Sequence, residues 1–257
     1  MEYLLTEKGK EDLRSLSKGQ PLYAFDFDGT LAKIVPEPSA AQMGRSVRFW
    51  LNALAKCAPT AVISGRSLED LRSRLGVEVS CLIGNHGSEG PHVDQADMRQ
   101  VREVCAGWLQ LVSDRFHAVL AQSGVFVEKK PYSVSFHYRT AERRGQARAL
   151  ISRVVTELTP SPRIVLGKSV VNVLPTIAWH KGTALVECMR RLGSTGALYV
   201  GDDVTDEDVF ALQDQRILTV RVGKKKGSSA RYFLKSQAEI TQVLRMLAEG
   251  KGTSSLV

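Results

Sequence analysis

The chain reads LYAFDFDGT at residues 22–30. The first four of these residues are apolar or aromatic, which is typical of a short buried strand, and the acids and glycine that follow would end it. Asp26 and Asp28 would repel each other if both were buried, so we expect a cation between them. Gly29 permits a sharp turn, and the Thr30 hydroxyl can hold a phosphate oxygen. Two aspartates alone suggest an ordinary acidic turn, but the residues around them favour a phosphoryl-transfer aspartate.

Two more apolar stretches follow in this part of the chain, at residues 60–63 and 79–83. Helical patterns, with apolar side chains three or four residues apart, lie between the stretches at residues 47–54 and 68–75. Strand and helix therefore alternate, and polar residues follow each strand. This order predicts an α/β fold with a doubly wound parallel sheet, in which ligands bind at the carboxyl ends of the strands.

Cap residues are expected before the first two of these helices. Ser39 with Gln42 forms a possible capping box, in which each side chain binds a backbone N–H group at the start of the helix. Ser67 can cap the second helix through its hydroxyl.

The pattern changes after residue 88. A long amphipathic helix, two strand-like stretches, a second helix and a hairpin follow one another, which is the order of an open α+β layer. We therefore predict an inserted domain over residues 89–175 and a core domain formed by residues 1–88 and 176–257. The strand and helix alternation resumes after the insertion, and from Gly250 onward the composition suggests a frayed tail.

The composition indicates a globular protein with a real core. The chain has 257 residues, 43% of them hydrophobic, and no apolar run approaches the roughly 20 residues that span a bilayer. The N-terminal residues lack the apolar middle of a signal peptide, so we expect a soluble, cytoplasmic protein without a membrane partner. The 4 cysteines are far apart and form no Cys-x-x-Cys pair, which indicates buried free thiols rather than zinc ligands or disulfides.

The formal charge of +8 raises the question of an anionic partner. Basic residues are scattered along the chain, and the run Lys224–Lys226 between glycines is typical of a solvated loop. A small anionic substrate explains the excess at least as well as nucleic acid does. A basic nucleic-acid-binding protein is therefore the less favoured alternative, and we expect no nucleic-acid partner.

Four polar clusters follow predicted strands or begin a predicted helix. They are the aspartates of residues 26–28, Ser64, Lys181 and the acidic stretch GDDVTDED at residues 201–208. One carboxylate can attack phosphorus, and a second, protonated carboxyl can give a proton to the leaving alkoxide and later take one from water. The serine hydroxyl, the lysine ammonium and Mg²⁺ would hold the phosphoryl group and its charge. Each cluster alone is a weak signal, and the later aspartates also suit the first turn of a helix.

In combination these clusters resemble the four motifs of the haloacid dehalogenase superfamily of phosphatases. VISGR at residues 62–66, GNHG at residues 84–87 and GDDVTDE at residues 201–207 are more narrowly similar to the trehalose-6-phosphate phosphatase family. The resemblance covers residues 20–247. It implies a Rossmann-like core, an α/β cap inserted after the third strand, and Mg²⁺-dependent hydrolysis of trehalose 6-phosphate through an aspartyl phosphate, in trehalose biosynthesis.

The resemblance also assigns roles to residues. It implies Asp26 as the nucleophile, Asp28 as the general acid and base, and Ser64 and Lys181 as phosphate ligands. The metal ligands that it implies are Asp26, Asp28, Asp202, Asp203 and Asp206.

The substrate-binding residues are expected to come from both domains. They are Thr30, Arg66, Asn85, His86, Glu128, Lys130, Ser133, His137, Arg139 and Asn172. Those between residues 128 and 139 resemble a sugar-binding stretch of the family, although a salt-bridged, exposed sheet face is an open alternative. The histidines share no metal-ligand spacing, which argues against a zinc site.

One segment departs from the family pattern. The family has an acidic residue and an arginine in the cap hairpin, where this chain has NVLP at residues 172–175, with Asn172 in place of the acid. An insertion-like segment, residues 176–180, then precedes Lys181. Loss of the acid removes a strong acceptor for sugar hydroxyls. Sucrose 6-phosphate and mannosyl-3-phosphoglycerate therefore remain alternative substrates, and we expect a sugar phosphate to be the partner of a monomer or weak homo-oligomer.

Overall fold

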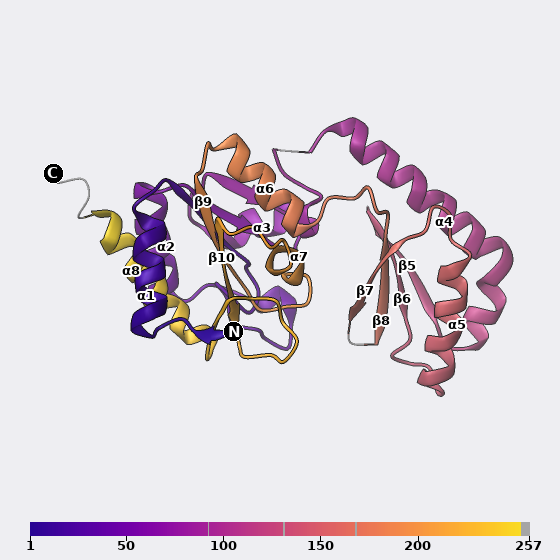
Figure 1. The fold of residues 1–257 in the computed structure, drawn as a ribbon. Coiled ribbons are helices and arrows are strands. Elements are labelled where there is room, and N and C mark those ends of the chain that lie inside the picture. The colour runs from indigo at the N-terminus through magenta and orange to yellow at the C-terminus, as the bar shows by residue number, and fades with distance from the viewer. Residues whose placement is uncertain (92, 131, 168, 253–257) are drawn as a thin grey trace. The chain divides into compact units, whose positions relative to one another are not determined.

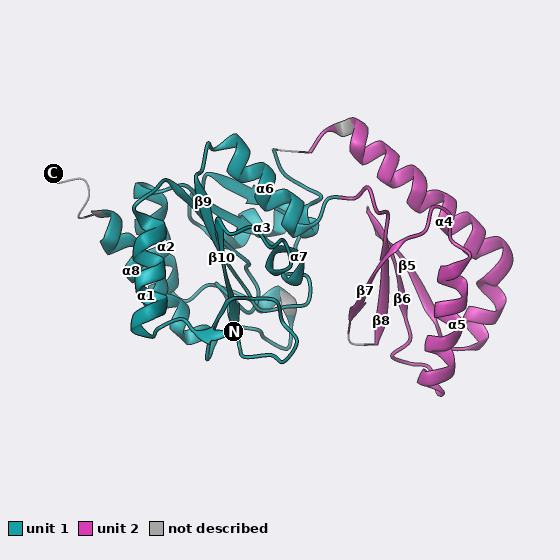
Figure 2. Cartoon of the chain, viewed as in Figure 1, with its two compact units in different colours: residues 1–92, 179–257 teal, residues 93–178 magenta. Residues whose placement is uncertain are grey.

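The computed structural model describes residues 1–91, 93–130, 132–167 and 169–252 (Figure 1). The chain divides into two compact units, residues 1–92 with 179–257 (unit 1) and residues 93–178 (unit 2) (Figure 2). The domain boundaries expected at 88/89 and 175/176 lie a few residues before these division points. The interpretation of the inserted segment as a cap stays a prediction.

Unit 1 is built on a seven-stranded sheet in which every pair of neighbours is parallel, in the order β1-β11-β10-β9-β2-β3-β4. Its strands are β1 (Glu2–Tyr3), β2 (Pro21–Phe25), β3 (Thr60–Ile63), β4 (Cys81–Ile83), β9 (Gly196–Gly201), β10 (Ile217–Val222) and β11 (Tyr232–Leu234). The predicted parallel α/β sheet is confirmed. The sequence pattern does not predict β1 and β11, because strands of two and three residues are too short to show a period.

Helices pack on both faces of this sheet. They are α1 (Glu7–Ser17), α2 (Arg45–Cys57), α3 (Leu68–Leu75), α6 (Lys181–Arg191), α7 (Glu207–Phe210) and α8 (Ile240–Gly252). All five residues of β2 are buried, because successive side chains point to opposite faces and both faces are covered. Tyr23 and Phe25 join the apolar cluster of α1, α2, α3 and α8, whereas Leu22 and Ala24 join that of α6 and α7.

The start of α2 differs from the expectation. Residues Pro38–Ala40 form a 3-10 turn, and the Ser39 hydroxyl donates a hydrogen bond to Glu37. α2 begins only at Arg45, after Gly44, which makes no side-chain cap. The predicted capping box of Ser39 and Gln42 is therefore wrong, because the helix begins too late for it. The predicted cap of α3 is confirmed, since the Ser67 hydroxyl accepts a hydrogen bond from the Asp70 N–H.

Two other short 3-10 helices lie at Asn85–Gly87 and Gln237–Glu239. The expectation of buried thiols holds for three cysteines and is wrong for Cys57, which is exposed at the last residue of α2. The expectation of a frayed tail from Gly250 is wrong for residues 250–252, because α8 continues to Gly252, and residues 253–257 lie outside the described residues. No helix within the described ranges is both long and apolar enough to cross a membrane.

Unit 2 is a four-stranded antiparallel sheet with two helices packed on one face, which confirms the predicted α+β layer. The sheet order is β5-β6-β8-β7. The elements are α4 (Gln95–Gln122), β5 (Phe126–Lys130), β6 (Ser133–His137), α5 (Arg144–Thr156), β7 (Arg163–Gly167) and β8 (Val170–Leu174). Val134, Phe136 and Val173 from the central strands pack with Trp108 of α4 and Ile151 of α5 in a separate apolar core.

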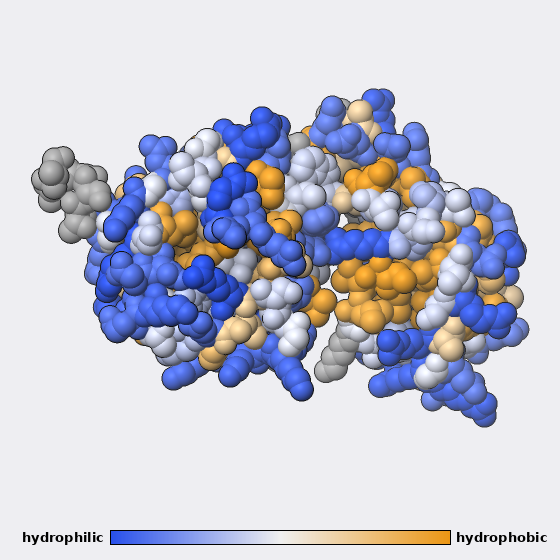
Figure 3. Space-filling model, in the orientation of Figure 1, coloured by the Kyte–Doolittle hydropathy of each residue, from blue (hydrophilic) through white to orange (hydrophobic). Residues whose placement is uncertain are grey.

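Burial falls off at the β7 edge of this sheet. Val134 of the central strand β6 is fully buried, whereas Ile164 and Leu166 of β7 are 52% and 48% exposed. A hydrophobic area is visible on unit 2 where β7 and β8 lie (Figure 3). The two helices therefore cover the centre of the sheet more completely than its β7 edge.

Candidate active site

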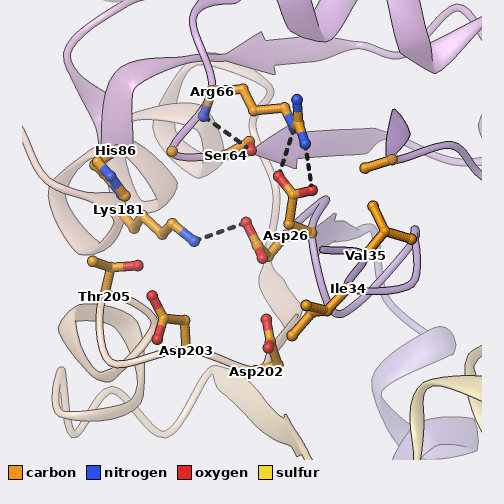
Figure 4. A pocket seen from close by; sticks show the side chains of 13 residues that line it. Asp26, Ile34, Val35, Ser64, Arg66, His86, Lys181, Asp202, Asp203 and Thr205 are labelled. Atoms are coloured by element: carbon orange, nitrogen blue, oxygen red, sulfur yellow. Dashed lines mark hydrogen bonds and ion pairs between the residues drawn. The ribbon is translucent and has the colours of Figure 1, made fainter. Parts of the chain in front are cut away.

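The expected catalytic residues of unit 1 meet at the carboxyl edge of its sheet. Asp26 directly follows β2, Ser64 follows β3, Asp202 follows β9, and Lys181 is the first residue of α6. They line one cavity of about 530 Å³, together with Asp28, Arg66, His86, Asp203 and Thr205 and the apolar side chains of Ile34, Val35 and Ala41 (Figure 4). Parallel strands bring their ends to one edge, so residues far apart in the chain converge there.

Lys181 lies at the centre of the site and is 1% exposed. Its Nζ donates hydrogen bonds to Asp26 Oδ1 at 2.8 Å and to Asp206 Oδ1 at 2.7 Å. Burial on its own would lower the pKa of Lys181, but the carboxylates of Asp206 and Asp26 more than offset it and raise that pKa. The ammonium is therefore a permanent positive charge between two buried acids.

The two acids differ in how the protein holds them. Burial raises the pKa of Asp26, and Lys181 opposes that rise only in part. Asp206 is buried as well, yet its pKa is lowered because Lys181, the Tyr199 hydroxyl at 2.7 Å and the Asp203 N–H at 2.8 Å all donate to it. Because these three donors hold the Asp206 carboxylate in one orientation, Asp206 in turn fixes the position of the Lys181 ammonium.

A divalent cation fits beside Asp26. Asp26, Asp202 and Asp206 each present a carboxylate oxygen within 4.8 Å of the others. Asp202 Oδ1 is buried and has no hydrogen-bond partner among the described residues, and burial raises the pKa of Asp202 to about 7. A Cβ on Gly29 would lie 2.1 Å from Asp202 Oδ2. Any residue other than glycine at this position would therefore clash with the Asp202 carboxylate. The orphaned oxygen and the all-oxygen donor set suit Mg²⁺.

Asp28 and Asp203 take different positions from the other expected metal ligands. Neither contributes a carboxylate to the cluster. The Asp28 carboxylate is bound on both oxygens by Arg66, with Nε 2.6 Å from Oδ2 and Nη2 2.7 Å from Oδ1. Arg66, expected to bind substrate, also donates to Asp70. The metal roles of Asp28 and Asp203 stay predictions.

The remaining expected residues of unit 1 lie in or near this cavity. Ser64 is fully buried, and its Oγ accepts a hydrogen bond from the Arg66 N–H at 3.3 Å. Thr30 is buried, and its hydroxyl has no hydrogen-bond partner among the described residues. His86 lines the cavity, whereas the Asn85 amide donates to Glu89 at 2.7 Å. Their substrate-binding roles stay predictions.

In unit 2 the expected sugar-binding residues share one face of the sheet but largely bind one another. Glu128 Oε2 lies 2.7 Å from His137 Nε2 and 3.6 Å from Lys130 Nζ, and these contacts, above all that with His137, lower the pKa of Glu128. Ser133 pairs with Lys130 across the two strands, and Arg139 lies beyond the end of β6. This arrangement agrees with the alternative that these residues form a salt-bridged, exposed sheet face.

Asn172 is used within the sheet. Its Oδ1 accepts a hydrogen bond from the buried Ser135 hydroxyl at 2.6 Å, and its Nδ2 donates to the Val165 carbonyl at 3.3 Å. The Asn172 amide therefore forms its hydrogen bonds with residues of the neighbouring strands β6 and β7. Contact between Asn172 and a sugar stays a prediction.

Two buried polar residues next to the site, Tyr199 and Arg221, are not among the residues expected from the sequence. Tyr199 OH donates to Asp206, and Arg221 donates to the carbonyls of Asp202 and Asp203. An arginine within the largely apolar stretch of residues 217–222 was a usable signal, because a charge in a buried strand needs partners. Tyr199 offered no comparable signal, since tyrosine is common in strands.

Comparisons with known proteins agree with this geometry. The trehalose-phosphatase family matches residues 24–238. A probable trehalose-phosphate phosphatase H of Arabidopsis thaliana is 31% identical, over 94% of this chain and 76% of its own length. A trehalose-phosphate phosphatase of Mycobacterium avium is 37% identical, over 76% of this chain and 52% of its own length. The structure of Aspergillus fumigatus trehalose-6-phosphate phosphatase in crystal form 3 superposes with a TM-score of 0.69 at 26% identity, covering 97% of this chain and 99% of that one.

The family match covers most of the chain, and the first of these relatives exceeds 30% identity over nearly the whole of it. The buried lysine, the paired aspartates and the acidic loop lie inside the matched region. The chain is therefore a phosphatase of the haloacid dehalogenase superfamily and belongs to the trehalose-phosphatase family.

Proposed function

We propose that this protein hydrolyses trehalose 6-phosphate to trehalose and phosphate, with Mg²⁺ bound at Asp26 and Asp202 and an aspartyl phosphate on Asp26. The observation that carries the proposal is the buried Lys181 ammonium, held between Asp26 and Asp206 beside the orphaned oxygen of Asp202. The names of the relatives support the substrate.

In the first step the Asp26 carboxylate attacks phosphorus and the bond from phosphorus to the sugar oxygen breaks. Asp28 gives its proton to that oxygen, so the sugar leaves as an alcohol. Lys181 and Ser64 donate hydrogen bonds to the phosphoryl oxygens as charge spreads over them, and bound Mg²⁺ would neutralise part of that charge. Lys181 already contacts Asp26, so its positive charge lies where the phosphoryl group arrives.

In the second step water attacks the phosphorus of the aspartyl phosphate, Asp28 takes a proton from that water, and Asp26 is released with free phosphate. Asp28 has to give up part of its double hydrogen bond with Arg66 before it can carry a proton. Arg66 therefore orients the carboxyl group of Asp28, which ends the second step carrying the proton that the next first step requires.

We include in the proposal that unit 2 is a cap and that its polar sheet face contacts the sugar. That face bears Glu128, Lys130, Ser133, His137 and Asn172. Closure of a cap would exclude bulk water from Asp26. A cytoplasmic reaction within trehalose biosynthesis completes the proposal.

A second candidate function is the same chemistry on another sugar phosphate. Both ends of the Asn172 amide are bound within the sheet, so this position lacks the free acceptor that an acid would offer to sugar hydroxyls. Sucrose 6-phosphate and mannosyl-3-phosphoglycerate are the substrates that this observation keeps open.

Phosphate release from trehalose 6-phosphate, sucrose 6-phosphate, glucose 6-phosphate and mannosyl-3-phosphoglycerate, with Mg²⁺ and with EDTA, tests the substrate. We expect trehalose 6-phosphate to be strongly preferred and EDTA to abolish release. Preference for another substrate would leave the chemistry standing and reject the substrate. No release from any of the four would reject the proposed reaction.

Asp26→Asn tests the nucleophile. An amide cannot attack phosphorus as a carboxylate does, so we expect turnover to fall at least about 1,000-fold, by analogy with the loss of other catalytic nucleophiles. Phosphate release at saturating substrate measures this loss, and a melting curve checks that the variant is folded. Full Mg²⁺-dependent turnover by Asp26→Asn would show that another residue is the nucleophile.

Asp28→Asn tests the acid and base role. We expect kcat to fall about 100- to 10,000-fold, the range of general acid and base catalysis, while substrate binding is largely kept. Steady-state kinetics separates the two effects. An unchanged kcat would remove Asp28 from proton transfer.

A further inference from the structure

Arg221 is a buried arginine for which the proposed chemistry has no direct use. It lies in β10, whose six residues are all buried, and it is 5% exposed. A buried guanidinium is costly unless its N–H groups find acceptors, so its partners indicate why it is there.

The partners of Arg221 belong to the acidic loop that follows β9. Nη1 donates to the Asp203 carbonyl at 3.0 Å and to Glu207 Oε1 at 3.1 Å, and Nη2 donates to the Asp202 carbonyl. One guanidinium thus binds two consecutive carbonyls of the main chain. The rigid fork of arginine can do this, whereas the single ammonium of a lysine cannot hold the same pair in the same way.

Glu207 fixes the guanidinium in turn. Its Oε1 accepts from Arg221, and its Oε2 accepts from the Ser229 N–H at 2.9 Å. The carboxylate therefore connects the start of α7, the arginine and the segment before β11. Glu207 and Ser229 are not among the residues that line the cavity containing Asp26.

We propose that Arg221 is a positioning residue for the metal site, which holds the Asp202 carboxylate beside Asp26 by binding the carbonyls of Asp202 and Asp203. The inference rests on the metal site of the proposed function. Asp202 Oδ1 has no protein partner among the described residues, so no side-chain hydrogen bond fixes that oxygen, and the backbone has to fix the residue. Arg221 supplies that backbone restraint from the neighbouring strand.

Arg221 also carries a charge, and its positive charge lowers the pKa of Asp202 against the larger effect of burial. Two substitutions of Arg221 separate the effect of its positive charge on metal binding from the effect of its hydrogen bonds to the two carbonyls. Arg221→Lys keeps the charge and loses the fork, whereas Arg221→Gln loses both. If position is what matters, both variants weaken metal binding.

Direct titration of the full-length protein with Mg²⁺ by calorimetry, without substrate, tests the proposal. We expect Arg221→Lys and Arg221→Gln to weaken Mg²⁺ binding by about 10- to 100-fold, the range for residues that orient metal ligands. The Mg²⁺ concentration for half-maximal activity should rise in parallel, while kcat at saturating Mg²⁺ stays within several-fold of wild type. Arg231→Gln is the matched control, because Arg231 pairs with Asp12 on the surface and should leave Mg²⁺ binding unchanged.

Three outcomes would overturn the inference. Wild-type affinity in both Arg221 variants would show that the arginine does not position the site. Wild-type affinity in Arg221→Lys with weak binding in Arg221→Gln would assign the effect to charge. Absence of Mg²⁺ binding by the wild type would reject the metal site itself, whereas the choice of substrate would still be decided by phosphate release in the substrate panel.

Circular dichroism would reveal whether the Arg221 variants fold. If they do not, Mg²⁺ titration of Glu207→Gln provides a second test of the proposal. This variant retains the arginine but weakens the charged hydrogen bond that orients it. We expect a smaller loss of Mg²⁺ affinity, of several-fold. Unchanged affinity in a folded Glu207→Gln protein would overturn the proposal.

Discussion

At the scale of single residues, the site depends on one buried cation. Lys181 lies between Asp26 and Asp206, which are 155 and 25 residues away in the chain. Removing one partner of a buried pair leaves the other charge uncompensated, which costs far more than the pair contributes on its own. The same arrangement therefore serves stability and chemistry together.

Lys181→Met should show this double role. Without the ammonium, two buried carboxylates face each other, and we expect the free energy of unfolding to fall by about 3–5 kcal/mol and activity to be lost. Urea denaturation measures the first effect. Lys251→Met is a suitable control, because Lys251 donates to the backbone carbonyls of Ser17 and Gly19 near the end of α1. Equal stability of the two variants would contradict the prediction.

Asp202 should make Mg²⁺ binding depend on pH. Its pKa of about 7 means that a proton occupies the metal-free carboxylate below pH 7 and must leave before the metal binds. We therefore expect Mg²⁺ affinity to fall by about tenfold from pH 8 to pH 6, with proton release on binding. Calorimetry in buffers of different ionisation enthalpy measures both. The same affinity and no proton release across this range would contradict the raised pKa.

At the scale of elements, α3 connects the site to the loop that precedes α2. Asp70 accepts hydrogen bonds from Arg66 and Arg74, and Arg74 Nη1 donates to the carbonyls of Ser39 and Ala41. The chain of contacts begins at Asp28, which Arg66 holds on both oxygens. The orientation of Asp28 therefore depends on the position of helix α3 as well as on the turn that follows β2.

Asp70 should contribute stability that depends on pH. Arg74 and Arg66 lower its pKa from 3.8 to about 2, so the contribution is fully present above the unfolded value and lost as the pH falls through about 2. Asp70 is about one-third exposed, so after allowance for solvent screening we expect Asp70→Asn to lower the free energy of unfolding by about 1 kcal/mol at pH 7.

Urea denaturation of Asp70→Asn and wild type at pH 7, 5 and 3 checks the expectation. The difference between the two proteins should shrink toward pH 3. Asp114→Asn is the control, because Asp114 is an exposed carboxylate of α4 that hydrogen-bonds Gln110. A difference that grows as the pH falls would reverse the sign and reject the assignment.

At the scale of the whole molecule, the two units have separate apolar cores. Unit 1 contains every residue of the candidate metal and phosphate site, at the carboxyl edge of its parallel sheet. Unit 2 has its own core of α4, α5 and an antiparallel sheet, and its polar face carries the residues that we propose to contact sugar. The residues proposed for the chemical steps are therefore in unit 1, and we propose that unit 2 selects the sugar.

Much of this organisation is predictable from the sequence. The apolar stretches before Asp26 and at residues 60–63 form strands where the pattern places them. Periodicity is a local property that records which side chains are buried, so it identifies strands, helices and the change of pattern in the insertion. The residues near Asp26 are likewise predictable, because parallel strands end at one edge of their sheet.

The partners of those residues are decided only in the tertiary structure. That Asp206 binds Lys181 and Tyr199, that Arg66 holds Asp28, and that Asn172 is bound within its sheet depend on contacts between distant segments. The short strands β1 and β11 also form only because neighbouring strands pair with them. The sequence by itself determined the order of elements and the set of reactive groups, because both follow from local residue types. Three-dimensional packing alone decided which charges neutralise one another and which oxygen is left for a metal.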